Sequence, residues 1–333
     1  FAEVSIPAPQ VEADWRRLPM ATLLTPMAEF DGALIERTAC GAYTFAGDLQ
    51  YVPRRGSQAG DKLYGAALCW YPEGAYGDDN FPTVWMSALD GSQPRGLFQV
   101  GPDSAPFHGN KTGAYLFSVP QWYADRYLGG RTLVTGKSRG TPHGSQGPAL
   151  VAFYPWQVEA PSGNLDARMM LYYRFIYPEC AEPNLGDKAS CDYPDFTMCD
   201  AWSGGAFVEH NGRSAIILAG IKGLGDNRYG PAQPGDCDSS QGYHCDPYER
   251  QILFYDIEQV GAAAVGQRDL WSVVPYAIWR PDAFFLRDAE GQTCGTLGGV
   301  TVDAQSGRVY VVERGFGEND ENAAVVHAWG LGD

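Results

Sequence analysis

One degenerate module recurs four times along this 333-residue chain. Each copy has a Gly-led strand, a turn, a second strand rich in β-forming residues, a long polar loop and a third strand. The last copy is the clearest, with strands at 297–303, 307–313 and 324–329 and a hairpin turn at 304–307. A module this small cannot bury its own apolar face, so neighbouring copies must stack to form a core. The repeat therefore predicts a single all-β domain over residues 1–333.

The three earlier copies keep the same order of strands. The third contains Asn211-Gly212 between two apolar runs, which is the strongest hairpin signal in the chain. The second has its turn enlarged by a short helix, predicted at 121–128. The predicted strands are 47–52, 62–71 and 83–88 in the first copy, 112–117, 131–136 and 147–153 in the second, and 204–209, 214–222 and 251–256 in the third.

A fourth short strand follows each of the first three copies, at 97–100, 169–175 and 271–279. The last copy has none, and residues 18–24 are predicted to supply it and close a ring. In this repeat logic the chain resembles secreted β-propeller proteins, a resemblance that implies four-stranded blades with long loop insertions. Four blades are predicted. Five are the alternative, because other strands could lie in the remaining segments, and a β-sandwich or a β-helix also stays open.

Composition narrows the class of protein and of partner. The glycines (41) and prolines (23) are spread over the whole length and only 19% of residues are charged, which excludes a disordered chain, a coiled coil and a helical bundle. With 40 acidic against 24 basic residues, the net charge is −16, which argues against nucleic acid and anionic lipid as partners. The longest strongly apolar run, 215–221, is far shorter than the roughly 20 residues of a membrane span.

Eight cysteines, an even number, favour disulfides in an oxidising compartment. A first residue other than Met agrees with a mature protein whose signal has been removed, so a secreted, extracellular or periplasmic location is predicted. Cys237 with Cys245 could close one local loop, and a second local bridge is expected among Cys180, Cys191 and Cys199. A zinc site at the cysteines is disfavoured, because neither paired CxxC motifs nor suitable histidine spacing accompany them.

One face of the propeller is predicted to carry the function. In a blade, the loop between the second and third strands emerges on the same side as the connection to the next blade, and such loops commonly bind ligands. In all four copies this loop is long and polar. Basic residues recur where the second strand ends, and in an otherwise acidic molecule they could converge near the axis on a carboxylate or sulfate. The predicted ligand-binding residues are Lys111, Lys137, Lys222, Arg228, Glu313 and Arg314, with Trp202 and Tyr71 as aromatic platforms for a sugar ring.

These residues favour an acidic polysaccharide as the ligand, and lyase-type β-elimination as the specific chemistry. Elimination needs a base near the uronate carboxylate and a cation that neutralises the carboxylate. The predicted catalytic residues are His108, His143, Tyr229 and Arg139, although no motif fixes them. A hydrolase using Asp200, Asp226 or Glu313 is a weaker alternative. Another is a non-catalytic propeller that binds a second secreted protein. A last alternative is that the loop charges are solvated and do not converge on a common site.

Acidic loop runs supply oxygen ligands of the kind that calcium prefers. The predicted calcium ligands are Asp78, Asp79, Glu318 and Asp320, and a further acidic run lies at 236–238. No phosphate-binding loop is present, because Gly-Leu-Gly at 223–225 lacks the Gly-Lys-Ser/Thr that would follow. No organic cofactor is expected.

Overall fold

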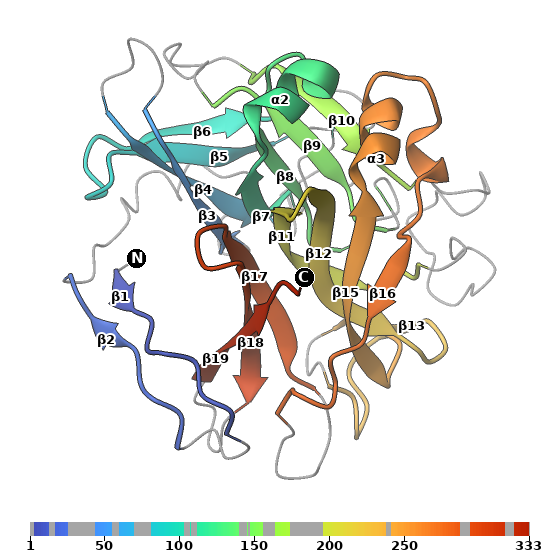
Figure 1. The fold of residues 1–333 in the computed structure, drawn as a ribbon. Helices are drawn as coiled ribbons and strands as arrows, with labels where there is room; N and C mark the ends of the chain where they lie inside the picture. Colours follow the sequence, from blue (N-terminus) through green and yellow to red (C-terminus); the bar gives the residue numbers. More distant parts are fainter. Residues whose placement is uncertain are drawn as a thin grey trace.

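A computed structural model describes residues 3–12, 17–25, 44–54, 60–69, 81–102, 107, 112–139, 145, 147–155, 164–173, 196–237, 241–286, 294–316 and 323–332. In this part of the chain, four antiparallel sheets surround a common axis as the blades of a β-propeller (Figure 1). The all-β fold and the count of four blades are confirmed.

Blades 1 and 2 each contain four strands in chain order from the axis outward. Blade 1 consists of β3 (Thr44–Val52), β4 (Lys62–Cys69), β5 (Pro82–Ser87) and β6 (Arg95–Gln99). Blade 2 consists of β7 (Thr112–Ser118), β8 (Leu133–Lys137), β9 (Leu150–Phe153) and β10 (Ala167–Leu171). The predicted helix between the first two strands of blade 2 is present as α2 (Gln121–Tyr123) followed by a short π-helix, η3 (Ala124–Leu128).

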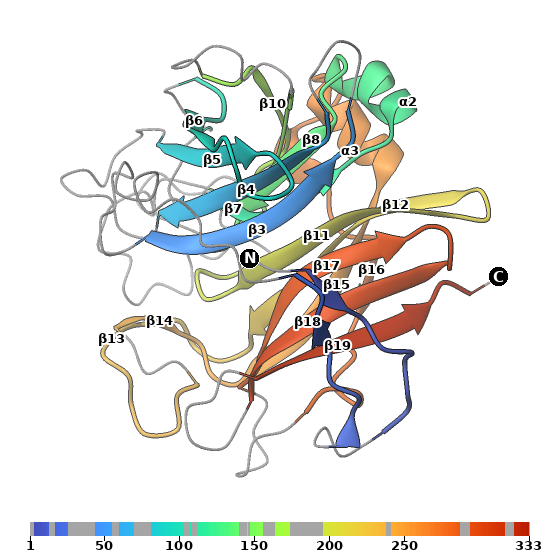
Figure 2. The ribbon, with the colours of Figure 1, turned by 90° about the vertical axis from the view of Figure 1, so that its left-hand side faces the viewer.

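Blade 3 has the longest insertion between its second and third strands. Its strands are β11 (Ala201–His210), β12 (Arg213–Gly223), β15 (Tyr248–Asp256) and β16 (Ala277–Trp279), and a separate hairpin of β13 (Arg228–Gly230) and β14 (Gly242–His244) lies between β12 and β15. Figure 2 shows this hairpin extending from the blade. The Asn-Gly turn joins β11 to β12 as predicted, with positive φ at Asn211 (48°) and Gly212 (72°).

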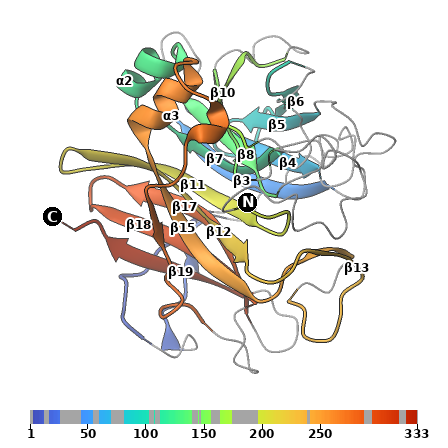
Figure 3. The same cartoon turned by 90° about the vertical axis from the view of Figure 1, so that its right-hand side faces the viewer.

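One helix of blade 3 is absent from the sequence prediction. Residues 271–279 are predicted as one strand, but the chain first forms α3 (Ile257–Ala264) and the 3-10 turn η6 (Leu270–Ser272), which leave only β16 for pairing. Asp256 caps α3 by accepting a hydrogen bond from the Gln259 backbone N–H at 2.9 Å. Figure 3 shows α2 and α3 side by side, and the Tyr123 hydroxyl donates to the Ile257 carbonyl at 3.0 Å.

Blade 4 contains three strands in the described residues: β17 (Thr296–Asp303), β18 (Arg308–Phe316) and β19 (Ala323–Gly330). The prediction that residues 18–24 complete this blade differs from the structure. That segment contributes only β2 (Thr22–Leu23), which pairs with β1 (Val4–Ser5) in a separate two-stranded sheet. The Leu24 backbone N–H donates to the Glu3 carbonyl at 2.8 Å, so backbone groups of this segment find partners within the N-terminal region. None of the helices in the described ranges is long and apolar enough to span a bilayer.

Glycines allow the innermost strands to approach backbone to backbone. A Cβ atom on Gly47 of β3 would lie 2.2 Å from the Gly113 carbonyl oxygen of β7. Likewise, a Cβ atom on Gly204 of β11 would lie 2.3 Å from the Gly298 carbonyl oxygen of β17. Both distances are shorter than a non-bonded contact allows, which explains why each module starts with glycine.

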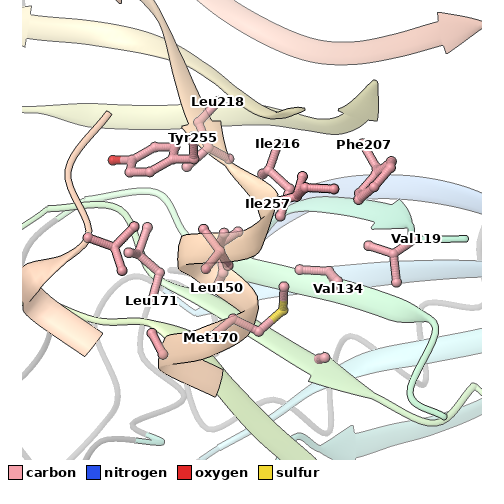
Figure 4. Close-up of a cluster of buried hydrophobic side chains, with 14 of the residues drawn as sticks. Val119, Val134, Leu150, Met170, Leu171, Phe207, Ile216, Leu218, Tyr255 and Ile257 are labelled. Carbon is pink, nitrogen blue, oxygen red and sulfur yellow. The ribbon is translucent and has the colours of Figure 1, made fainter. Parts of the chain in front are cut away.

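Apolar side chains fill three of the four joints between blades. Figure 4 shows the joint of blades 2 and 3, where Val134, Leu150 and Met170 face Ile216 and Leu218. A second cluster joins blades 1 and 2, and a third joins blades 3 and 4. We call the joint of blades 4 and 1 the polar seam. Among the described residues its contacts include Asp48 of β3, whose Oδ1 lies 3.6 Å from the position of a Cβ on Gly299 of β17, and no described apolar cluster spans it.

Candidate functional site

Four of the predicted cations lie near the end of a second strand in blades 2, 3 and 4, but their environments differ. Lys137 is the last residue of β8, and Arg139 follows it two residues later; both are buried. Lys222 lies one residue before the end of β12 and is partly buried, whereas Arg314 in β18 is exposed. The cations are therefore at equivalent places in the fold but are not equally accessible.

Lys137 has the most unusual environment of these residues. Only 4% of its surface is exposed, and its Nζ has no hydrogen-bond partner in the described structure. Burial lowers the pKa of Lys137 to about 7. An ammonium group removed from water without a counter-charge is costly, so this position favours either a neutral amine or the arrival of an anion.

Arg139 connects blade 2 to the start of blade 3. It forms an antiparallel bridge with Ala201, and the Trp202 backbone N–H donates to the Ser138 carbonyl at 2.6 Å. The Arg139 guanidinium donates from Nη2 to the Cys199 carbonyl at 3.2 Å, while its Nε makes no hydrogen bond in the described residues. Two loops from neighbouring blades are thus held together beside Lys137.

Lys222 faces this same junction but already has a counter-charge. Its Nζ lies 3.1 Å from Oδ2 of Asp200, which is fully buried. The Asp200 carboxylate also accepts hydrogen bonds from the backbone N–H groups of Thr197 and Gly223, both at 3.0 Å. Burial raises the pKa of Asp200, and the Lys222 charge and these hydrogen bonds oppose that rise. With both oxygens occupied, Asp200 anchors the loop and is poorly placed for the acid role in the hydrolase alternative.

Four buried donors around this junction lack an acceptor in the described structure. They are Lys137 Nζ, Ser138 Oγ, Arg139 Nε and Trp202 Nε1. We call residues 137–139 with 200–202 and Lys222 the blade 2–3 junction. Buried donors without acceptors are uncommon in folded proteins, which makes this junction a candidate binding site. The predicted role of Trp202 as a stacking platform does not fit, because the ring is 1% exposed and packs in the apolar core.

Arg314 lies at the polar seam instead. A Cβ atom on Gly298 would lie 3.2 Å from Arg314 Nε, so the guanidinium covers the backbone of β17. Across the seam, the Asp48 carboxylate accepts hydrogen bonds from the backbone N–H groups of Leu49 (2.8 Å) and Leu116 (3.0 Å). Burial raises the pKa of Asp48 to about 6, against these hydrogen bonds and the positive charge of Arg314. The predicted cations therefore form two groups, and sequence analysis missed Asp48, whose only signal is an acid directly after the glycine of an inner strand.

The other predicted site residues within the described ranges are placed elsewhere. Glu313 is buried, with its carboxylate 3.2 Å from Arg250 Nη2 and 2.8 Å from His327 Nε2, so it belongs to an internal ion network of blades 3 and 4. Arg228 pairs with Asp236 in the β13–β14 hairpin. Tyr229 on the same hairpin is 44% exposed, which leaves it open to solvent.

Eight predicted site residues lie outside the described part of the chain. They are His108, His143, Lys111, Tyr71, Asp78, Asp79, Glu318 and Asp320. Two of the three predicted bases and all four predicted calcium ligands are in this group, so lyase chemistry and calcium binding stay predictions.

The expected local bridge between Cys237 and Cys245 is wrong, whereas Cys180 and Cys191, named for the second expected bridge, lie outside the described residues. Cys199 bonds to Cys245, and Cys237 bonds to Cys294, with sequence separations of 46 and 57. The reason is the fold of the β12–β15 connection, where the Leu224 backbone N–H donates to the Cys245 carbonyl at 3.1 Å and brings Cys245 back to the start of β11. No free cysteine is found among the described residues, as expected for an oxidised protein.

A shallow groove of about 740 Å³ lies away from this junction, lined by Phe107, β10 and residues 263–271. Both of its arginines already have acceptors. Arg168 donates to the Tyr127 carbonyl at 2.9 Å, and Arg268 donates to Gln259 Oε1 at 2.8 Å. The groove therefore has less unsatisfied binding capacity than the blade 2–3 junction. In comparisons with known proteins, no family model, no curated protein and no solved structure matches this chain.

Proposed function

We propose that the blade 2–3 junction binds an anionic group of an acidic polysaccharide outside the cell. The observation that carries this proposal is Lys137, a buried lysine whose Nζ has no hydrogen-bond partner in the described structure. A carboxylate or sulfate would supply the missing charge and the missing acceptors together. The disulfides agree with an oxidising compartment, where extracellular polysaccharides occur.

Arg139 supports an oxyanion as the bound group. Its planar guanidinium presents donors in a fork that matches carboxylate and sulfate geometry, and its Nε is without an acceptor in the described residues. The net charge of −16 repels polyanions from most of the surface, so binding must depend on this local cation pair. The ligand that fits is one with well-separated acidic groups, such as a uronate chain. A densely charged polyanion would be repelled by the acidic surface of the protein.

The β13–β14 hairpin offers a surface for the sugar ring. Cys245 follows β14 directly and is bonded to Cys199, whose carbonyl accepts the Arg139 hydrogen bond. Tyr229 and Tyr243 on this hairpin have ring centroids 4.9 Å apart, and Tyr229 is exposed. Exposed tyrosine rings can pack against the C–H face of a sugar while their hydroxyls stay in water.

Lyase chemistry is an extension of this proposal. A base would remove the proton beside the uronate carboxylate, a C=C bond would form, and the glycosidic C–O bond on the next carbon would break. Arg139 would neutralise the carboxylate, and Tyr229 is the predicted base within the described residues. The ultraviolet absorbance of the unsaturated product would measure turnover.

The test is binding of polygalacturonate, alginate, a sulfated glycan and a neutral glucan, measured by isothermal titration calorimetry. The wild type is expected to bind a uronate chain and not the neutral glucan. Lys137→Met and Arg139→Gln should each weaken binding about tenfold or more, because a charged hydrogen bond contributes roughly 1.5–3 kcal/mol. Lys62→Met is the matched control, since Lys62 begins β4 at the opposite end of a second strand. Absence of binding, or equal binding by all variants, would refute the proposal.

The outer edge of blades 3 and 4 favours a second candidate function, the binding of another secreted protein. Tyr276 and Phe284 are both 59% exposed there, beside partly exposed Ile278. In the described residues β19 pairs only with β18, and an added strand on its other edge would be the mode of binding. This candidate predicts that Phe284→Ser abolishes self-association or partner capture while glycan binding stays unchanged, measured by light scattering and calorimetry.

A further inference from the structure

We propose that the β12–β15 connection of blade 3 binds one divalent transition-metal ion of the zinc class through Asp236, His244 and Asp246. One ligand atom from each residue lies within 4.8 Å of the other two. All three belong to or flank the β13–β14 hairpin, and Asp236 is part of the acidic run at 236–238. The proposal is independent of the blade 2–3 junction.

The His244 ring is oriented with Nδ1 toward Asp236. The ring is only 2% exposed, and Nε2 lies 3.1 Å from the Gly230 carbonyl oxygen. A carbonyl can only accept, so Nε2 carries a hydrogen, and Nδ1 is the ring nitrogen left to face an ion. Nδ1 is buried and makes no hydrogen bond in the described structure. Metal-binding histidines commonly donate their other ring N–H to a backbone carbonyl in this way.

The two carboxylates present oxygen atoms toward the same space. Asp246 accepts a hydrogen bond from the Cys237 backbone N–H at Oδ1 (2.8 Å), and its buried Oδ2 has no partner in the described residues. Asp236 Oδ2 lies 3.3 Å from His244 Nδ1 and is fixed by the Gln233 backbone N–H at 2.6 Å. A buried imidazole nitrogen and a buried carboxylate oxygen, both without donors, are better explained by a cation between them than by solvent.

Local charge also favours a cation. Arg228 pairs with Asp236, so a single guanidinium accompanies the two carboxylates of the site. Arg228 thereby orients the Asp236 ligand without neutralising the site, as outer-shell partners of metal ligands do.

The donor set selects the kind of ion. Calcium and magnesium take oxygen ligands, whereas imidazole together with carboxylates suits zinc and its neighbours in the first transition row. Zinc bonds of about 2.1 Å place tetrahedral ligands roughly 3.4 Å apart. The present limit of 4.8 Å is wider, so the ligands must close around the ion. Three protein ligands leave a fourth position for water.

Two disulfides fasten the ligands on both sides. Cys237, next to Asp236, is bonded to Cys294, and Cys245, between His244 and Asp246, is bonded to Cys199. Binding therefore orders few additional bonds, which lowers its entropic cost. Because these sulfurs are already in disulfides, the ion has only nitrogen and oxygen ligands here.

The test uses the full chain, freed of metal by a chelator and then titrated with zinc chloride in a calorimeter. Cobalt(II) is added to a second sample to record its visible spectrum. The wild type should bind one equivalent of zinc, show the absorption of four- or five-coordinate cobalt without a thiolate band, and melt at a higher temperature with zinc. Calcium and magnesium should not compete. Asp246→Asn and His244→Gln should each weaken zinc binding at least tenfold. Asp226→Asn, an exposed acid of the same connection, should bind as the wild type does.

Absence of a one-equivalent zinc isotherm for the wild type would overturn the proposal and leave a His244–Asp236 ion pair as the role of these residues. Unchanged affinity in both ligand variants, or equal affinity for calcium, would also overturn it. Near-ultraviolet circular dichroism of the metal-free variants checks their fold. If a variant is misfolded, the wild-type cobalt spectrum decides, because octahedral cobalt with water ligands absorbs far more weakly than cobalt in a closed protein site.

Discussion

Replacing Lys137 by methionine should stabilise the protein, and by an amount that depends on pH. Methionine has a similar length and no charge, so it removes the cost of burying an amine while it keeps most of the packing. The fall of the Lys137 pKa from 10.5 to about 7 corresponds to about 5 kcal/mol, at about 1.4 kcal/mol for each pH unit. This value is an upper limit for the gain.

The pH dependence follows from which state holds the proton. Between pH 7 and 10.5 the unfolded chain keeps the proton on Lys137, whereas the folded chain has released it. Raising the pH through this window therefore stabilises the wild type by about 1.4 kcal/mol per unit, and below pH 7 the full cost is present without a slope. The advantage of Lys137→Met should be about 5 kcal/mol near pH 6 and about 3 kcal/mol near pH 8.5.

Urea unfolding followed by tryptophan fluorescence at the two pH values measures this difference. Lys62→Met, at a partly buried site, is the control and should show no comparable dependence on pH. A Lys137→Met variant that is less stable than the wild type, or a gap that does not narrow from pH 6 to pH 8.5, would show that Lys137 has a counter-charge in solution. Excess uronate ligand should stabilise the wild type more than the variant, because only the wild type has an ammonium to pair.

Three further substitutions test the fold around the site. Asp200→Asn should lower the free energy of unfolding by about 3 kcal/mol, because a buried charged hydrogen-bond network loses its acceptor; urea unfolding measures the loss, and a near-neutral result would contradict the network. Replacing Cys237 and Cys294 together by serine should lower the free energy of unfolding by about 4 kcal/mol, because the bond closes a loop with a sequence separation of 57. The variant should melt at a lower temperature than the wild type, and reductant should lower its melting temperature less than it lowers that of the wild type. Gly204→Ala should cost about 3 kcal/mol by forcing two strands apart, whereas Gly330→Ala, with no atom within 4 Å of the added Cβ, should be neutral in the same assay.

The local pattern was enough to predict the blades. Glycine at the start of each inner strand, the Asn211-Gly212 turn and the alternation of short strands with polar loops are all contained within single modules. They predict the blade strands with small shifts in the bounds, except that β16 is much shorter than expected and the β13–β14 hairpin was not predicted. The helix α3 was missed because residues 257–264 are short and mostly apolar or small, so they carry weak helical periodicity beside a strong strand.

The site was only partly predictable, because burial and pairing depend on contacts between blades. The end of the second strand correctly located Lys137, Arg139 and Lys222, but the sequence did not indicate that Asp200 would neutralise one of them. Sequence spacing likewise favoured a local Cys237–Cys245 bridge, while the hairpin directs the two cysteines to different blades. Long-range pairing of this kind leaves no local signal.

The polar seam between blades 4 and 1 has a consequence for how the molecule would open. Apolar clusters hold the other three joints, so separating those joints exposes apolar surface to water. Separating Gly299 from Asp48 at the polar seam exposes mainly polar atoms among the described residues. The ring thus behaves as a row of four blades whose two ends meet at the polar seam. Local opening would start at the polar seam and separate blade 4 from blade 1, while the contacts that join blades 1 to 4 in a row would stay intact. Amide protons of β3 and β17 that face the polar seam would then exchange with solvent before those of β7 and β11.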